Sequence, residues 1–328
     1  MRPAVHPALA RLRRDPATVQ VGTDPGPAVV LGGLQPVVAD VLLGLDGRRQ
    51  LSDLRRTVER RGGDPAALDA ALAELDRAGV LVDRRLPPER VAEALTAGPS
   101  AAGSAGRLLA GAWVEVRGAD RVGAAVASLL AAVGTGLVTV DDRRVTEPGE
   151  PCPGGLAEED VGRRRGPAAE RAAHLAGRRG HAPARRRTRP DLVVLAPGAA
   201  GPRNTAATLQ AEGVPHLVVT AGATAGTVGP LVLPGSSSCL RCHDLHRADR
   251  DPAWVRLAQQ TDQATPAGIC PAPLAWSLAA LAAQHTAVRL GGGEPPTVDG
   301  TLDVALPDLL PRRRSWRQHP SCGCAWCG

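Results

Sequence analysis

The stretch Trp113-Val-Glu-Val-Arg-Gly-Ala-Asp-Arg-Val-Gly123 decides the fold class of this 328-residue chain. Its first half, Trp113–Arg117, predicts a buried strand, and residues 121–133 predict a helix. Between them, Gly118 and Gly123 have the spacing that lets a backbone approach a phosphate at a helix N-terminus. A strand, a glycine turn and a helix in this order predict the first unit of an α/β sheet.

The alternation of strands and helices continues outward from this turn. Apolar runs predict strands at residues 136–141, 192–196, 217–220, 226–233 and 301–306. Helices are expected at residues 166–176, 205–212, 252–260 and 273–289. Strands separated by helices of this length favour a mainly parallel sheet, with residues 226–233 as an antiparallel edge strand.

Residues 1–85 predict a small α+β module of the winged-helix type. Strands are expected at residues 18–21, 28–34 and 80–82, and helices at residues 35–45, 53–61 and from 65 onward. Ser52 and Asp64 are the candidate caps of the last two helices. Residues 86–107 are rich in Pro, Ala, Gly and Ser and predict a linker, which leaves residues 108–328 as the second domain.

Five of the seven cysteines form two groups far apart in the sequence, Cys239-Leu-Arg-Cys242 and Cys322-Gly-Cys324-Ala-Trp-Cys327. Two close pairs of thiolates predict a tetrahedral, structural Zn²⁺ site rather than a catalytic one. The preferred ligands are Cys239, Cys242, Cys324 and Cys327, because Cys-x-x-Cys is the better knuckle spacing. Cys322 is the alternate ligand.

Composition limits the classes of function. The chain contains no Phe, Tyr or Lys, so the net charge of +6 comes from Arg that stands in for Lys, as a G+C-rich genome would produce. The charge is therefore weak support for nucleic-acid binding. Residues 1–16 do not resemble a secretory signal, and residues 272–290 are too polar to span a membrane. Cysteines in such a chain suit the reducing cytoplasm.

The nucleotide-binding signal is damaged at one position. Asp120 replaces the middle glycine of the turn and would bring a negative charge toward a pyrophosphate. Asp141 lies at the end of the second strand, about 20 residues after the turn, where an acid normally holds the ribose hydroxyls. A degenerate nucleotide site is therefore expected at Gly118, Gly123 and Asp141, and ATP is a doubtful cofactor.

The C-terminal region from Trp113 onward resembles the ThiF-type, ubiquitin-activating-like family. The likeness rests on the glycine turn, on Asp141-Asp-Arg-Arg-Val145, on Asp160-Val-Gly-Arg163, and on Gly229-Pro-Leu-Val-Leu-Pro-Gly235 before the first cysteine pair. The segment from Cys242 to Trp254 and the ending His319-Pro-Ser-Cys-Gly-Cys324 resemble actinobacterial cyclodehydratase or leader-peptide-binding partners of thiazole/oxazole-modified peptide (bacteriocin) biosynthesis. In that family a PqqD-like recognition element precedes a Rossmann-like ThiF domain.

The resemblance implies a function. The N-terminal module would bind the leader of a ribosomal precursor peptide and present the peptide to a YcaO-type cyclodehydratase. A second copy of the chain is a further candidate partner, in a homodimer. The leader would add as a strand along Ala28, Val29, Val30 and Leu31, and would contact Leu72 and Leu75 on the following helix. The alternative of DNA binding is less favoured, because the arginines are not gathered on one recognition helix.

Active members of the family have groups that this chain lacks. They have an Arg-Gln pair where this chain has residues 146–155, a Lys where it offers only Arg164 and Arg165, and a metal-binding Asp where it has Ala196. Adenylation needs cations and a metal to offset phosphate charge, so we expect this activity to be lost. The alternative is an active adenylyltransferase that uses ATP to activate the C-terminus of a carrier protein or peptide.

Overall fold

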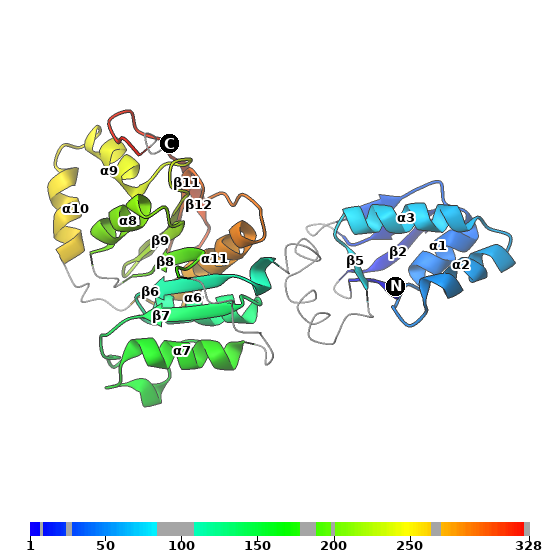
Figure 1. The fold of residues 1–328 in the computed structure, drawn as a ribbon, viewed down its shortest axis with the longest axis horizontal. Helices are drawn as coiled ribbons and strands as arrows, with labels where there is room; N and C mark the ends of the chain where they lie inside the picture. The colour runs from blue at the N-terminus through cyan, green and yellow to red at the C-terminus, as the bar shows by residue number, and fades with distance from the viewer. Residues whose placement is uncertain are drawn as a thin grey trace. The chain divides into compact units, whose positions relative to one another are not determined.

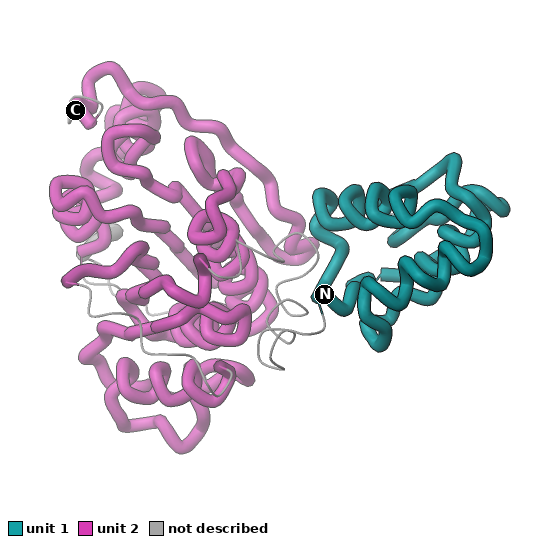
Figure 2. The backbone as a smooth tube through the Cα atoms, turned by 45° about the vertical axis from the view of Figure 1, so that its right-hand side comes forward, with its two compact units in different colours: residues 1–107 teal, residues 108–328 magenta. Residues whose placement is uncertain are grey.

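A computed structural model describes residues 1–6, 9–23, 28–83, 108–177, 188–197, 201–263 and 270–324. The chain divides into two compact units, residues 1–107 and 108–328, which Figure 2 distinguishes by colour. The predicted linker, residues 86–107, lies outside the described residues.

The N-terminal unit packs helices against two small antiparallel sheets. Strands β1 (Pro3–Val5) and β5 (Leu81–Asp83) form one sheet, and β2 (Arg11–Asp15), β3 (Thr18–Val21) and β4 (Val29–Leu31) form the other in that order. The helices are α1 (Pro36–Leu43), α2 (Leu51–Arg60) and α3 (Pro65–Arg77). Strands β1 and β2 were not predicted, because β1 has only three residues and β2 is exposed throughout and rich in Arg.

The two predicted helix caps have different outcomes. Asp64 caps α3, since its side chain accepts a hydrogen bond from the backbone N–H of Ala66. Ser52 does not cap α2: it lies inside that helix, which begins at Leu51 and has Gln50 at its N-cap position. The prediction for Ser52 is therefore wrong.

The C-terminal unit is built on a seven-stranded sheet with the order β12-β11-β10-β9-β8-β6-β7 (Figure 1). The parallel part contains β6 (Trp113–Arg117), β7 (Leu137–Asp141), β8 (Leu192–Leu195) and β9 (His216–Ala221). The antiparallel part contains β10 (Ala225–Val232), β11 (Gly300–Ala305) and β12 (Arg312–Ser315). Strand β10 is antiparallel as predicted, but it is not an edge strand, because β11 and β12 extend the sheet beyond it.

The two faces of this sheet are covered by different helices. On one face, α6 (Arg121–Ala132) and α11 (Ala272–Leu290) share a core with Leu192, Val194 and Leu217. On the other face, α8 (Pro202–Ala211) packs on Val193 and Leu195. Successive residues of β8 belong to the two cores in turn, because neighbouring side chains of a strand point to opposite faces of the sheet.

The remaining helices lie at the margins of the sheet (Figure 1). They are α7 (Arg165–Ala176), which packs on α6 and β7, α9 (Leu240–Ala248), which packs on α8, and α10 (Trp254–Gln263), which packs on α9. Among the described helices, none combines the length and the apolar character that crossing a bilayer requires.

Candidate functional sites

The glycine turn lies between β6 and α6, at the carboxyl ends of the parallel strands. Gly118 has a positive φ of 92°, which favours glycine. A Cβ atom on Gly123 would lie 2.0 Å from the carbonyl oxygen of Gly118, so only glycine fits there. The backbone path of a nucleotide-binding turn is therefore retained at both predicted glycines.

The carboxylate of Asp120 accepts hydrogen bonds from the backbone N–H groups of this turn. It is the N-cap residue of α6, and its Oδ1 accepts from the backbone N–H groups of Val122 at 3.0 Å and Gly123 at 3.1 Å. These are helix N-terminal groups of the kind that bind phosphate in nucleotide sites. Its carboxylate therefore occupies the position that an incoming phosphate would need.

The acid that contacts the glycine turn is Asp142, the residue after the predicted Asp141. Oδ2 of Asp142 accepts from the backbone N–H of Ala119 at 2.8 Å, and both of its oxygens accept from Arg144. Burial acts to raise the pKa of Asp142, but the hydrogen bonds from Arg144 and Ala119 outweigh it and lower the pKa. The side chain of Asp141 is exposed, and its carbonyl oxygen accepts from the N–H of Gly118.

Arg165, one of the two basic candidates for the missing lysine, is buried in an ion pair. Its side chain is 5 % exposed, its Nε donates to Oε2 of Glu150 at 2.9 Å, and its Nη2 lies 2.6 Å from Oε1 of the same residue. Asp142 and Glu147 lie farther away, at 3.9 and 4.0 Å. Its charge is already neutralised, so it is poorly placed to bind a phosphate.

Sequence reasoning missed Arg144 and Glu150 as members of this site. Glu150 belongs to an irregular loop, where no periodicity indicates which side chains point inward. Its only sequence signal is its place in the stretch that replaces the family's Arg-Gln pair.

We expect that Asp120→Asn will stabilise the protein at neutral pH. Burial raises the pKa of Asp120 to about 6, against the hydrogen bonds from Gly123 and Val122. The folded state therefore favours the protonated acid. The free energy of unfolding of the wild type falls as the pH rises from about 3.8, the pKa in the unfolded state, through about 6, the pKa in the folded state. Asn is neutral and caps equally well. Urea unfolding at about pH 4 and about pH 7.5 should show the advantage of Asn growing by on the order of 2 kcal/mol. A difference independent of pH would contradict this assignment.

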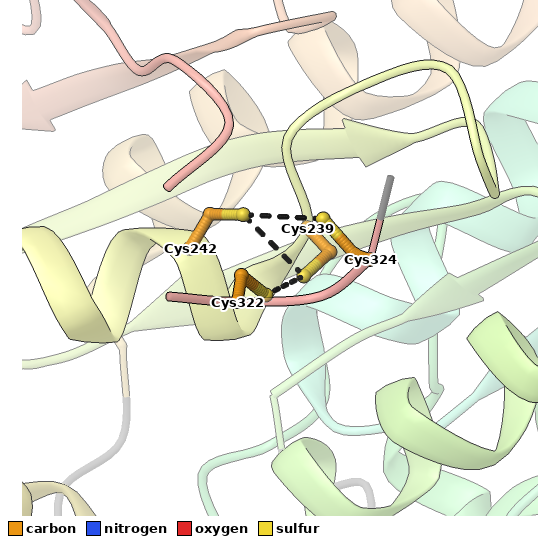
Figure 3. A group of neighbouring side chains, drawn as sticks. All are labelled: Cys239, Cys242, Cys322 and Cys324. Carbon is orange, nitrogen blue, oxygen red and sulfur yellow. Dashed lines mark hydrogen bonds between the residues drawn. The ribbon is translucent and has the colours of Figure 1, made fainter. Parts of the chain in front are cut away.

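A second candidate site is a group of four buried cysteines, Cys239, Cys242, Cys322 and Cys324 (Figure 3). The Sγ atom of Cys239 lies 3.8 Å from that of Cys242 and 3.4 Å from that of Cys322, and Cys242 lies 3.4 Å from Cys324. A disulfide needs about 2.05 Å, whereas a tetrahedron with metal–sulfur bonds of about 2.3 Å has edges of about 3.8 Å. The group could therefore hold a metal ion.

The electrostatics of the four thiols suit a cation. A hydrogen bond from the thiol of Cys239 lowers the pKa of Cys242, while burial and neighbouring thiols raise the pKa of Cys324. A divalent cation bound among the four sulfurs would favour ionisation of all four thiols. The preferred ligand Cys327 lies outside the described residues, and the alternate ligand Cys322 is the one grouped with the others.

The histidines beside the cysteines have structural roles. His319 donates its backbone N–H to Sγ of Cys242 at 3.3 Å. Its Nδ1 accepts from the N–H of Ser321, so its Nε2 carries the proton that Asp249 accepts at 2.9 Å. Although His246, Asp249 and His319 lie within reach of one ion, the ring of His319 keeps no lone pair for it. His243 is buried, and its ring stacks on that of Trp316.

A third candidate site is the edge of the small sheet in the N-terminal unit. Strand β4 pairs only with β3 among the described strands, and Val30 on it is 49 % exposed. Ala28 just before the strand is exposed, whereas Leu31 is buried. Leu72 and Leu75 are core residues with exposures of 5 % and 0 %, so these two predicted peptide contacts are not available on the surface.

Comparison with known proteins supports the fold. No protein-family model matches the sequence, and no curated protein is detectably similar to it. Among solved structures, Escherichia coli MccB with AMPCPP and MccA has a TM-score of 0.71 at 16 % identity over 100 % of both chains. The microcin C7 biosynthetic enzyme MccB with N-formylated MccA has a TM-score of 0.68 at 15 % identity, over 99 % of this chain and 100 % of that chain.

A heterocyclase in complex with substrate and cofactor is also similar, with a TM-score of 0.63 at 16 % identity. The match covers 98 % of this chain and 39 % of the heterocyclase. At these identities the likeness shows the fold alone. The predicted Rossmann-like, ThiF-type α/β fold is confirmed.

Proposed function

We propose that this protein binds the leader of a ribosomal precursor peptide and presents the peptide to a YcaO-type cyclodehydratase in azole-containing peptide biosynthesis. The ThiF-like unit would serve as a scaffold without adenylation activity. The observation that carries this proposal is the self-capped glycine turn, in which the carboxylate of Asp120 holds the N–H groups of Val122 and Gly123.

The charges around the turn support the loss of adenylation. Transfer of an adenylyl group requires uncompensated cations to stabilise phosphate charge. Arg165 is paired with Glu150, and Arg144 is paired with Asp142. A nucleotide would have to displace Asp120 and compete with two ion pairs, which makes the site a poor phosphate receptor.

The exposed edge strand supports peptide binding. An edge strand presents unpaired N–H and C=O groups, to which an extended peptide can add as a further strand. Strand β4 has such an edge and an exposed apolar side chain at Val30. Proteins of similar fold have been seen with a partner or substrate bound, MccB with MccA and a heterocyclase with its substrate and cofactor, which is compatible with this proposal.

Zinc is the metal that we propose for the four cysteines. A donor set of four sulfurs in tetrahedral arrangement is typical of structural zinc, and it leaves no position for water or substrate. The ion would join the start of α9 to the segment that contains Cys322 and Cys324, and would have no catalytic role.

Titration calorimetry with a synthetic leader tests the proposal. The probe is the leader of a Cys/Ser/Thr-rich precursor encoded beside this gene. We expect binding by the wild type, and a loss of affinity of about tenfold or more in Val30→Glu, because a charge on the edge opposes strand addition. The matched control is Leu12→Glu, an exposed residue on β2 at the opposite edge of the same sheet. No binding at high micromolar concentration, or equal losses in both variants, would overturn it.

An active adenylyltransferase is the second candidate. It is favoured by the similarity over the whole chain to MccB, one structure of which contains AMPCPP. Pyrophosphate exchange with ATP separates the two candidates, because the scaffold should show no exchange above background. Robust exchange would refute the proposed loss of adenylation and leave leader binding to be judged by calorimetry.

A further inference from the structure

Four free thiols in contact have a second chemistry besides metal binding, which is oxidation to disulfides. The two shortest separations join different segments of the chain. Sγ of Cys239 lies 3.4 Å from that of Cys322, and Sγ of Cys242 lies 3.4 Å from that of Cys324 (Figure 3). Within the first segment, the sulfurs of Cys239 and Cys242 are farther apart, at 3.8 Å. The geometry therefore favours pairing between the segments over pairing within one.

The four cysteines also differ in their access to small molecules. Cys239, Cys322 and Cys324 line a cavity of about 420 Å³ beside α8 and α9, and they are 6, 8 and 8 % exposed. Cys242 is not part of this lining and is 0 % exposed. One water molecule takes up about 30 Å³ in the liquid, so a cavity of this size admits a molecule as small as hydrogen peroxide. Such an oxidant meets the pair Cys239 and Cys322 before it meets Cys242.

The pairing decides what becomes of the connection between the two segments. Cys239 and Cys322 are 83 residues apart in the sequence, and Cys242 and Cys324 are 82 apart, so either bond keeps the C-terminal segment attached to the start of α9. A bond between Cys239 and Cys242, which are 3 residues apart, leaves the C-terminal segment unattached. A disulfide stabilises a fold more as the loop that it closes lengthens. Bonds between the segments therefore replace the connection that a metal would supply.

We propose that the four cysteines form a redox switch, in which a peroxide converts them into disulfides between the two segments, with the bond of Cys239 and Cys322 formed first. One thiolate of this pair attacks the peroxide, breaks its O–O bond and becomes a sulfenic acid, and hydroxide leaves. The other thiolate then attacks the sulfenic sulfur and displaces a second hydroxide. The two thiolates lose two electrons, which the peroxide gains.

The inference rests on the proposed zinc site in one respect. A metal ion held by four thiolates would keep only two of them after the first disulfide forms, so it would be released. Oxidation would thus exchange the metal for covalent bonds without detaching the C-terminal segment from α9.

Tryptic mapping under non-reducing conditions tests the pairing. Full-length protein, reduced and loaded with zinc, is treated with one equivalent of hydrogen peroxide, and its remaining thiols are alkylated in denaturant. Trypsin cuts after Arg241, which separates Cys239 from Cys242, and after Arg317, which releases the C-terminal peptide. We expect the peptide that ends at Arg241 to be linked to the C-terminal peptide. Fragmentation should place the bond at Cys322, and dithiothreitol should reverse it.

A second equivalent of peroxide should link Cys242 to Cys324 and complete the release of zinc, which a chromophoric chelator measures. The fully oxidised protein should melt at a higher temperature than the reduced protein stripped of metal, because both bonds close long loops. The matched control is Cys270→Ala, which removes a buried cysteine outside the group and should give the same linked peptides.

Three results would overturn the proposal. The first is the absence of any linked peptide after excess peroxide. The second is a link between the peptides of Cys239 and Cys242, and the third is sulfinic acid at these cysteines in place of disulfides. The zinc assignment fails separately: purified protein that takes up no zinc would refute it, and the pairing would then be read on the metal-free thiols. Leader binding and pyrophosphate exchange bear on neither result.

Discussion

Replacement of Cys242 by alanine is expected to abolish zinc binding and to destabilise the C-terminal unit strongly. Sγ of Cys242 contacts the sulfurs of Cys239 and Cys324 and accepts the backbone N–H of His319. Because a structural metal contributes its binding free energy to folding, we expect a loss of more than about 4 kcal/mol. Metal analysis of the purified protein and urea unfolding measure the two effects.

The control for this variant is Cys270→Ala, a cysteine that is also buried but lies outside the group of four. It should keep one equivalent of zinc and lose about 1 kcal/mol, the effect of a small cavity. If Cys242→Ala retained its zinc, the metal site would be refuted.

The same assay decides the fourth ligand. Among the described residues Cys322 completes the group of four, with its Sγ 3.4 Å from that of Cys239, whereas the Cys-x-x-Cys spacing favours Cys327, which lies outside them. We expect Cys322→Ala to lose zinc and Cys327→Ala to retain it. The reverse result would restore the ligand set that spacing alone predicts.

Neutralising Glu150 is the second change with a large expected effect. Glu150→Gln leaves the guanidinium of Arg165 buried, with its remaining acids, Asp142 and Glu147, at 3.9 and 4.0 Å. Removing one partner of a buried pair costs about 3–5 kcal/mol, and because Gln keeps a hydrogen bond we expect about 2–3 kcal/mol in urea unfolding. The control is Glu159→Gln, an exposed acid of the same connecting segment, which should change stability by less than about 0.5 kcal/mol.

A double variant completes this test. Arg165→Met combined with Glu150→Gln removes the buried charge together with its partner, so its loss should be smaller than the sum of the two single losses. Additive losses would mean that the pair does not interact, and Arg165 would then be available to a phosphate.

The sequence was sufficient to predict the fold class because strand and helix periods are local signals. It predicted β6 to the residue and α6 to within one residue, and it identified Asp64 as a cap. It could not show that Leu72 and Leu75 are core residues, because an apolar helical stripe looks the same whether it faces the core or a groove.

The candidate sites were harder to predict, because they depend on which side chains meet in three dimensions. Asp120 was recognised as an obstacle to phosphate, but its role as the cap of α6 required the geometry of Val122 and Gly123. The ion pair of Glu150 and Arg165 spans an irregular loop, where no periodic pattern indicates which side chains meet.

The outermost strand of the large sheet restricts how two copies of this protein could associate. Strand β12 is Arg-Arg-Arg-Ser, and all four residues are exposed. Arg312 and Arg314 are paired with Asp308 and Asp303, so two such strands placed side by side would repel each other mainly through Arg313. Charged side chains on an edge strand discourage growth of the sheet from one molecule into the next. A symmetric pair of molecules is therefore expected to meet through another surface than this charged edge.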